Sequence, residues 1–221
     1  MSAAALLDRL AALDTCVVSD ALDRLELRGT VHGIGRLWAC PRVAGRVVTV
    51  QLGPFAEEAA ASAPHLGTRA IEAASADHVV VIANGGRVEM AGWGGLLSRA
   101  ARRRGVRGVI VDGACRDVDE AQELSFPLYA RAAVPTTARG RAIELTTNAT
   151  VTIDGVTVAP GDLVVADGSG VVFVPTGSAD EVLATAEQLA NREAELAAHI
   201  DRGLPPTEVL GGNYERMLDR D

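Results

Sequence analysis

The sequence predicts an α/β fold with a central parallel-rich sheet, covering helices and a smaller layer of antiparallel hairpins. Composition is the first observation behind this prediction. Of the 221 residues, 48% are hydrophobic but only 3% are aromatic, so valine, alanine, leucine and isoleucine must build the core. Such residues are typical of parallel strands that are covered on both faces. The second observation is a strand–helix–strand pattern over 77–112, and the third is a series of hairpin signals after residue 150.

The N-terminal segment is expected to form two helices. Residues 3–13 predict the first, because leucine recurs there at helical spacing. A second helix is expected to start at Ser19 or Asp20, which are good capping residues, and to stop at Gly29.

The middle of the chain carries the strand–helix–strand unit. Residues 42–53 are rich in valine and predict a strand, and one or two helices are expected around Pro64. A buried strand is expected over 77–86, ending in a glycine turn. A helix follows over 94–104, and a second buried strand over 108–112. Four residues of that helix are expected to point inward, with a glycine as its C-cap: Leu96, Leu97, Ala100 and Ala101, followed by Gly105.

The C-terminal half predicts hairpins and one long helix. Residues 118–131 read as a helix followed by a short strand. One hairpin is expected at Asp154–Gly155 and another at 168–170, because these glycine-containing turns separate valine-rich runs. A long acidic helix is expected over 178–202. No internal repeat and no change of composition divides the chain, so a single domain over 1–221 is expected.

Charge and composition exclude several classes of function. The net charge of −8 and the isoelectric point near 5.0 argue against nucleic acid as a partner, because phosphate binding needs a basic face. Three widely spaced cysteines predict no disulfide framework and a reducing, cytoplasmic location. No apolar run approaches the roughly 20 residues of a membrane span. The chain contains no lysine, which excludes an aldolase that forms a Schiff base with its substrate.

Two loops of the strand–helix–strand unit point to a binding site. Both strands are parallel, so the loop after each strand reaches the same edge of the sheet. The first loop leads to a glycine-rich helix start with free backbone amides: Gly94, Gly95, Leu96 and Leu97. The second carries Arg116, which can fork onto a carboxylate, and Asp117, which can hold Mg²⁺. Together these groups suit a small 2-oxo acid. The alternative is that Arg116 and Asp117 only cap the next helix.

Several segments of the chain resemble the RraA-like family in order and in spacing. They are "SDALDRL" (19–25), "GRVVTVQ" (45–51), "WGGLLSRAARRRGVRGVIVDGACRDVDE" (93–120), "FPLYARAAVP" (126–135) and "GDLVVADGSGVVFVP" (161–175). The resemblance covers nearly the whole chain. It implies a swivelling β/β/α-type fold and a homotrimeric ring, sometimes doubled to a hexamer. The family includes 4-hydroxy-4-methyl-2-oxoglutarate aldolase, 4-carboxy-4-hydroxy-2-oxoadipate aldolase and the regulator of ribonuclease E activity.

The resemblance also implies roles for residues. Asp117 would hold Mg²⁺ or Mn²⁺, Arg116 would bind the pyruvate-like part of the substrate, and the helix-start amides would hold its carboxylate. A glutamate from the C-terminal helix of a neighbouring subunit would complete the metal site. Glu193 is the first match for it and Glu195 the second. The segment 178–221 is therefore expected to pack on a neighbouring subunit.

Gly95 departs from the family pattern, because the aldolases carry an acidic residue at this position. Loss of an acid–base group commonly lowers a rate by about 10²–10⁴-fold, and Glu89 is the one substitute that the sequence suggests. Three interpretations stay open. The first is a metal-dependent lyase that cleaves a 4-hydroxy-2-oxo acid to pyruvate or decarboxylates oxaloacetate through a metal-stabilised enolate. The second is a non-catalytic regulator, and the third is an enzyme of diverged chemistry.

Overall fold

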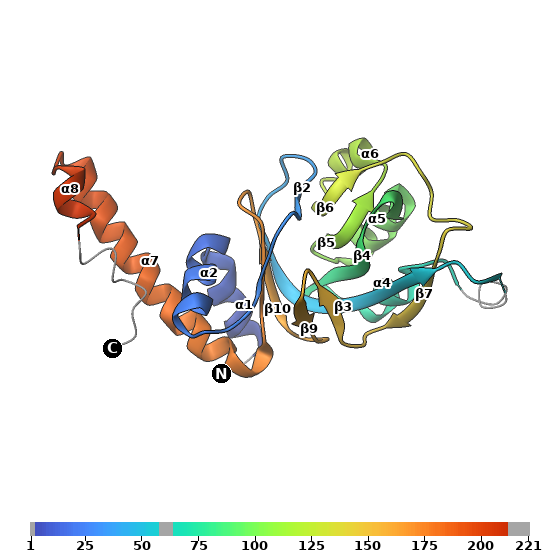
Figure 1. Ribbon diagram of the computed structural model, residues 1–221, viewed down its shortest axis with the longest axis horizontal. Coiled ribbons are helices and arrows are strands. Elements are labelled where there is room, and N and C mark those ends of the chain that lie inside the picture. Colours follow the sequence, from blue (N-terminus) through green and yellow to red (C-terminus); the bar gives the residue numbers. More distant parts are fainter. Residues whose placement is uncertain (1–2, 58–63, 212–221) are drawn as a thin grey trace.

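The computed structural model describes residues 3–57 and 64–211, and it places most strands in one mixed sheet (Figure 1). In the order in which they pair, these strands are β1 (Thr30–Val31), β11 (Val171–Val174), β10 (Leu163–Ala166), β3 (Val43–Pro54), β4 (His78–Trp93), β5 (Val109–Cys115), β6 (Leu128–Ala133) and β2 (Gly35–Arg36), and β7 (Ala142–Thr147) pairs with the second half of β3. A separate hairpin is formed by β8 (Val151–Ile153) and β9 (Val156–Val158).

The helices form two groups (Figure 1). One group covers a face of the parallel strands: α4 (Thr68–Ala73), α5 (Gly95–Arg104) and α6 (Val118–Glu123). The other group packs on β10 and β11 at one end of the molecule: α1 (Ala3–Ala12), α2 (Thr15–Arg24) and α7 (Ala179–Asp201). A 3₁₀ turn (Thr176–Ser178) leads into α7, and the short α8 (Pro206–Val209) follows it.

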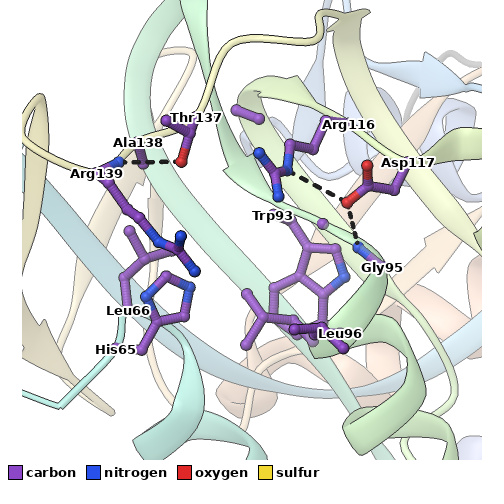
Figure 2. Close-up of a pocket in the computed structure, with 13 residues that line it drawn as sticks. His65, Leu66, Trp93, Gly95, Leu96, Arg116, Asp117, Thr137, Ala138 and Arg139 are labelled. Atoms are coloured by element: carbon purple, nitrogen blue, oxygen red, sulfur yellow. Dashed lines mark hydrogen bonds and ion pairs between the residues drawn. The ribbon is translucent and has the colours of Figure 1, made fainter.

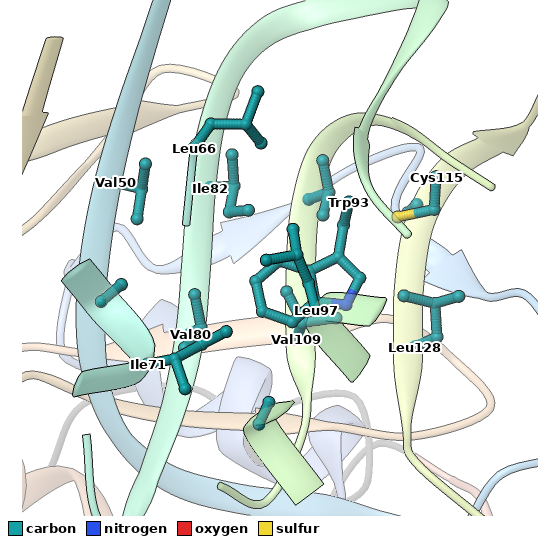
Figure 3. Close-up of a cluster of buried hydrophobic side chains, with 14 of the residues drawn as sticks. Val50, Leu66, Ile71, Val80, Ile82, Trp93, Leu97, Val109, Cys115 and Leu128 are labelled. Atoms are coloured by element: carbon teal, nitrogen blue, oxygen red, sulfur yellow. The ribbon is translucent and has the colours of Figure 1, made fainter. Parts of the chain in front are cut away.

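The sheet centre consists of β3, β4, β5 and β6, which run parallel to one another. Successive residues of a strand point to opposite faces. Val80 and Ile82 therefore face the helices, where Trp93 and Leu97 complete the cluster (Figure 3). The alternate residues of the strand, Val79 and Val81, point to the other face and pack on the hairpin of β8 and β9. Both faces are covered, which confirms the predicted α/β fold with a parallel-rich sheet and a hairpin layer.

The strand predicted over 77–86 does not end at its glycines. It continues as β4 to Trp93, because Gly85 and Gly86 adopt positive φ angles of 62° and 72° and form an irregularity within the strand. Pairing with β5 then resumes, and Trp93 lies opposite Cys115. The extension brings the end of β4 level with the end of β5.

The boundaries of α2 differ from those predicted. Its N-cap is Asp14, whose Oδ1 accepts a hydrogen bond of 2.9 Å from the amide of Val17, so Ser19 and Asp20 lie inside the helix. The helix ends at Arg24, before Gly29. Of the helices predicted around Pro64, α4 is described, and residues 58–63 lie outside the described part of the chain.

Helix α5 and its glycine C-cap, Gly105 with φ of 86°, are confirmed. Only part of its predicted inward face is buried. Leu97 and Ala101 pack on the sheet, whereas Leu96 is 77% exposed and Ala100 is also exposed. The buried stripe is narrow because α5 contacts the sheet along positions one turn apart.

Both predicted hairpins are confirmed. Asp154 and Gly155 adopt φ angles of 48° and 78°, the positive pair that a tight two-residue hairpin needs. The strands β10 and β11 fold back on each other around 167–170.

The long C-terminal helix α7 is confirmed, and its first half packs within the chain. Five residues of that half are buried against α1, α2 and the sheet: Ala179, Val182, Leu183, Ala186 and Leu189. The second half extends beyond the body of the molecule and carries α8 (Figure 1). Packing of this extension on a neighbouring subunit stays a prediction, and residues 212–221 lie outside the described part. Within the described residues, no helix combines the length and apolarity that crossing a membrane requires.

A buried ion pair joins the sheet to the hairpin layer. Arg131 Nε lies 2.6 Å from Asp112 Oδ1, and the Asp112 side chain is only 5% exposed. The same guanidinium lies 3.6 Å from Asp154 in the hairpin turn and donates to the carbonyl of His32. One side chain thus holds four segments together.

Replacing Arg131 with alanine is expected to lower the free energy of unfolding by about 3 kcal/mol, because Asp112 would remain buried without its partner. Urea denaturation followed by circular dichroism measures the change. The matched control is Arg102→Ala, an exposed arginine of α5, which should change stability by less than about 0.5 kcal/mol. Equal stability of the two variants would contradict the role assigned to Arg131.

Candidate active site

A cavity of about 300 Å³ lies where β4 and β5 end (Figure 2). The residues predicted to form a site at this edge all line it: Gly94, Gly95, Leu96, Leu97, Arg116 and Asp117. They meet because β4 and β5 are parallel and end level with each other.

The start of α5 presents backbone amides to the cavity. Gly94 is the N-cap residue and offers no side chain, so the first amides of the helix need other partners. The amide of Gly95 donates to Asp117 Oδ2 at 2.9 Å. The amides of Leu96 and Leu97 have no hydrogen-bond partner within the described residues, and both residues line the cavity. This helix start can therefore bind an anion.

Asp117 occupies the N-cap position of α6 but does not cap that helix with its side chain. Its backbone has a φ of 58°, a left-handed conformation that is uncommon for a residue other than glycine. The side chain reaches α5 instead and accepts the Gly95 hydrogen bond. The interpretation of the Arg–Asp pair as a mere helix cap is therefore wrong.

Arg116 is held beside Asp117 with most of its guanidinium free. Its amide donates to the carbonyl of Trp93 at 3.0 Å, which fixes its backbone to the end of β4. Its Nε lies 3.2 Å from Asp117 Oδ2. The two terminal nitrogens have no partner in the described chain and can fork onto a carboxylate.

The floor of the cavity is apolar and buried. Trp93 is 1% exposed, its ring stacks on Phe126 with centroids 6.4 Å apart, and its Nε1 donates to Ser98 Oγ at 2.9 Å. Burial raises the pKa of the nearby Cys115 thiol, which keeps it neutral. Cys115 therefore acts as a small apolar residue of the core.

A carboxylate that sequence reasoning missed lies next to Gly95. A Cβ atom at position 95 would overlap Oε2 of Glu120, so the glycine leaves the space that this carboxylate fills. Glu120 is fixed there by an ion pair of 2.9 Å with Arg99 of α5. Glu89, the substitute suggested by the sequence, is exposed on β4 and does not line the cavity. One sequence pattern could have indicated this position of Glu120. It follows Asp117 by three residues, and residues at that spacing in a helix lie on the same side.

Two further cavity residues come from loops without a motif. His65 precedes α4, and Arg139 lies between β6 and β7. Burial lowers the pKa of His65, and the positive charges of Arg139 and Arg116 lower it further. Sequence reasoning could not place them here, because no local pattern connects either loop with the helix start.

Among the described residues that line this cavity, the carboxylate of Asp117 has one oxygen that is available to bind a cation. Asp117 Oδ1 has no partner among the described residues, whereas Oδ2 is held by Gly95 and Arg116. Those residues contain no group of three or more His, Cys, Asp or Glu side chains arranged to hold a metal ion. Glu193 does not line the cavity of its own chain. Burial raises its pKa, and Asp20 of α2 raises it further, so it lies near α2. Its role at a neighbouring subunit's cavity stays a prediction.

Comparisons with known proteins point to one family. Residues 15–173 match the family described as RraA-like, aldolase/RraA. Over 178 residues the chain is 30% identical to Protein DlpA of Legionella pneumophila, which covers 80% of this chain but only 29% of the length of DlpA. It is 32% identical to the putative 4-hydroxy-4-methyl-2-oxoglutarate aldolase of Halalkalibacterium halodurans, covering 80% of this chain and 79% of that protein.

Solved structures agree with this match. An uncharacterized protein from Pseudomonas syringae superposes with a TM-score of 0.83 at 31% identity, covering 93% of this chain and 96% of that one. Streptomyces coelicolor RraAS2, described as an unusual member of the RNase ES inhibitor RraA family, superposes with a TM-score of 0.77 at 27% identity. That match covers 86% of this chain and 93% of RraAS2.

The contact between Gly95 and Glu120 predicts that substitutions at the two positions are coupled. Gly95→Ala should be better tolerated in a Glu120→Ala background, with a coupling energy of about 1 kcal/mol or more in a double-mutant cycle of urea denaturation. As a control, Gly177→Ala should show no coupling with Glu120→Ala, because a Cβ at position 177 meets open space. Additive effects of the first pair would contradict the assigned contact.

The surroundings of His65 predict its titration. Its pKa should lie below the ordinary value of about 6.5 and should rise in Arg139→Ala, because a positive charge that disfavours protonation is removed. Two-dimensional NMR of the imidazole resonances across pH 4–8 measures both values. An unchanged pKa in the variant would show that Arg139 does not act on this ring.

Proposed function

The chain belongs to the RraA-like family, and on that premise we propose that it is a lyase that uses Mg²⁺ or Mn²⁺ to break a carbon–carbon bond of a small 2-oxo acid. The reaction is the retro-aldol cleavage of a 4-hydroxy-2-oxo acid to pyruvate, the decarboxylation of oxaloacetate, or both. One observation carries the proposal. A carboxylate, a guanidinium and free helix-start amides converge on one small cavity.

The substrate carboxylate is bound by α5 and Arg116. The free amides of Leu96 and Leu97 donate to one oxygen, and the helix dipole favours the negative charge. The terminal nitrogens of Arg116 donate to the other oxygen. Because the floor around Trp93 is apolar and buried, these hydrogen bonds act in a medium of lower dielectric constant than water and are strengthened.

Asp117 Oδ1 is the atom that would hold the cation, with the substrate and water supplying the remaining ligands. A bound divalent cation supplies Lewis acidity that draws electron density from the 2-oxo group. Asp117 itself is oriented by the hydrogen bond from the Gly95 amide and by the ion pair with Arg116. Glu193 of a neighbouring subunit is proposed as a further ligand, which requires the chain to form a homotrimer or hexamer.

Bond cleavage leaves an electron pair on the pyruvate fragment in both reactions. In the retro-aldol reaction the C3–C4 bond breaks and the 4-hydroxyl loses its proton, so a carbonyl compound leaves. In the decarboxylation the leaving group is carbon dioxide. The fragment then takes up a proton at C3 and is released as pyruvate. A Schiff-base route is excluded because the chain contains no lysine.

The likeness to RraAS2 supports a second candidate function, a regulatory protein that binds a protein partner through its surface. Leu96, which is 77% exposed at the mouth of the cavity, would suit such a contact. The free guanidinium nitrogens of Arg116 and the strained Asp117 favour the lyase, because a surface binder has no use for a polar cavity.

Pyruvate release, coupled to lactate dehydrogenase, tests the lyase. Wild-type protein with Mg²⁺ or Mn²⁺ is expected to release pyruvate from 4-hydroxy-4-methyl-2-oxoglutarate or from oxaloacetate, and EDTA should abolish release. Arg116→Ala should lower kcat/KM by about 10- to 100-fold, the equivalent of one or two charge-assisted hydrogen bonds. Asp117→Asn should abolish the metal-dependent rate.

Arg102→Ala provides the control, since this arginine lies on the exposed face of the same helix and should leave turnover unchanged. Pyruvate release that is no faster than with the free metal ion would contradict the proposed lyase activity and favour the regulatory function. Pyruvate release by Asp117→Asn at the wild-type rate would show that Asp117 is not needed to hold the cation.

A further inference from the structure

A buried hydroxyl joins the end of β4 to the start of α5. Ser98 is the fourth residue of α5 and is 1% exposed, and Trp93, the last residue of β4, is buried to the same degree. Trp93 Nε1 lies 2.9 Å from Ser98 Oγ, and the same oxygen lies 3.2 Å from the carbonyl oxygen of Gly94. An indole N–H can only donate and a carbonyl can only accept, so the hydroxyl accepts from Trp93 and donates to Gly94.

The carbonyl of Gly94 and the amide of Gly95 belong to one planar peptide group. Its carbonyl also accepts a hydrogen bond of 3.0 Å from the backbone amide of Ser98. Its N–H donates to Asp117 Oδ2 at 2.9 Å. A continuous hydrogen-bond network therefore runs from the indole of Trp93 through one hydroxyl and one peptide group to the carboxylate of the candidate site.

The network closes into a ring. Asp117 Oδ2 lies 3.2 Å from Arg116 Nε (Figure 2), and the backbone amide of Arg116 donates to the carbonyl of Trp93 at 3.0 Å. Trp93 thus holds both halves of the site, the start of α5 through its side chain and the Arg116–Asp117 pair through its backbone. Hydrogen bonds that are linked in this way polarise one another, and each strengthens the next.

The peptide group between Gly94 and Gly95 cannot be fixed by a side chain at the N-cap position. Gly94 has none, and a Cβ atom there would lie 2.9 Å from Asp117 Oδ2 and 3.2 Å from the Arg116 side chain. The carboxylate and the guanidinium of the site therefore occupy the space that a capping side chain would need. Ser98 fixes the peptide group from inside the helix instead, because its hydroxyl bonds back to the carbonyl four residues earlier.

We propose that Ser98 is a positioning residue of the site, which holds the Gly94–Gly95 peptide group and, through it, the Asp117 carboxylate. Because that amide and the neighbouring ion pair engage Oδ2, Oδ1 is left for a ligand. The same peptide plane sets the direction of the next two amides, those of Leu96 and Leu97. The consequence for ligands rests on the proposed function, in which Oδ1 holds a cation and these amides bind the substrate carboxylate.

Burial makes the hydroxyl difficult to replace. An alanine at position 98 would leave Trp93 Nε1 as a buried donor without an acceptor, and the carbonyl of Gly94 would lose one of its two donors. Solvent does not reach either side chain, so water is not available in their place. The loss is therefore expected to be felt at the Gly95 amide and at Asp117.

NMR of the ligand-free protein tests the network. The sequence contains two tryptophans, and the indole N–H of Trp38, which donates to the carbonyl of Phe126, is an internal reference. Ser98→Ala is expected to shift the indole resonance of Trp93 upfield and to shift the amide resonance of Gly95, because both lose their link through the hydroxyl. Ser98→Thr, which keeps a hydroxyl, should restore both. An unchanged Gly95 amide resonance in Ser98→Ala would overturn the proposal.

A binding measurement tests the consequence for the site. In isothermal titration calorimetry with Mg²⁺ present, Ser98→Ala is expected to bind pyruvate about 3- to 10-fold more weakly than the wild type, the equivalent of about one hydrogen bond. Ser98→Thr should recover most of the affinity. The matched control is Ala101→Gly, which removes a buried methyl group from the same helix but no hydrogen bond of the network, and which should keep the wild-type affinity. Equal losses in Ser98→Ala and Ala101→Gly would overturn the positioning role.

The two experiments separate this proposal from the proposed function. Wild-type protein that does not bind pyruvate would contradict the proposed function, and the NMR comparison would still decide whether Ser98 positions the peptide group. Wild-type protein that binds pyruvate no more tightly than Ser98→Ala would overturn the positioning role and leave the proposed function intact.

Discussion

The parallel pairing of β4 with β5 is the constraint on which the candidate site depends. Pairing holds from Val80 to Ala83, breaks at the glycine irregularity of β4 and resumes until Trp93 lies opposite Cys115. Both strands therefore deliver their following residues to the same point of the sheet edge. The start of α5 and the Arg116–Asp117 pair come from segments more than 20 residues apart, and this register alone brings them into hydrogen-bond contact.

The contact between Asp117 and Gly95 joins two helices. A carboxylate at the N-cap position of α6 accepts a hydrogen bond from the first amide of α5. The side chain of Asp117 does not cap α6. Its backbone is left-handed, and its side chain contacts α5. Such a conformation destabilises a residue other than glycine by about 1 kcal/mol or more and persists where the surroundings enforce it. Here the surroundings are the ion pair with Arg116 and the hydrogen bond from the Gly95 amide. The same two contacts therefore hold the left-handed backbone of Asp117 and orient its carboxylate in the site.

Charge is distributed unequally around the cavity. Arg116 has Asp117 beside it, Glu120 is paired with Arg99, and Glu144 is buried with Arg69. Among the described residues, Arg139 is the charged side chain of the cavity that has no ion-pair partner, although the whole chain has a net charge of −8. A strongly acidic protein thus contains a locally cationic cavity, which would attract small anions while the outer surface repels large ones.

The sequence by itself determined the α/β class, the parallel strand–helix–strand unit, both hairpins and the cavity residues from Gly94 to Asp117. These follow from local patterns of hydrophobicity, turn chemistry and chain order. Only the tertiary structure decided that Glu120 fills the space beside Gly95 and that His65 and Arg139 form the opposite wall. The reason is physical: these residues meet through loops and neighbouring helices, and no local periodicity records a contact between segments that are distant along the chain.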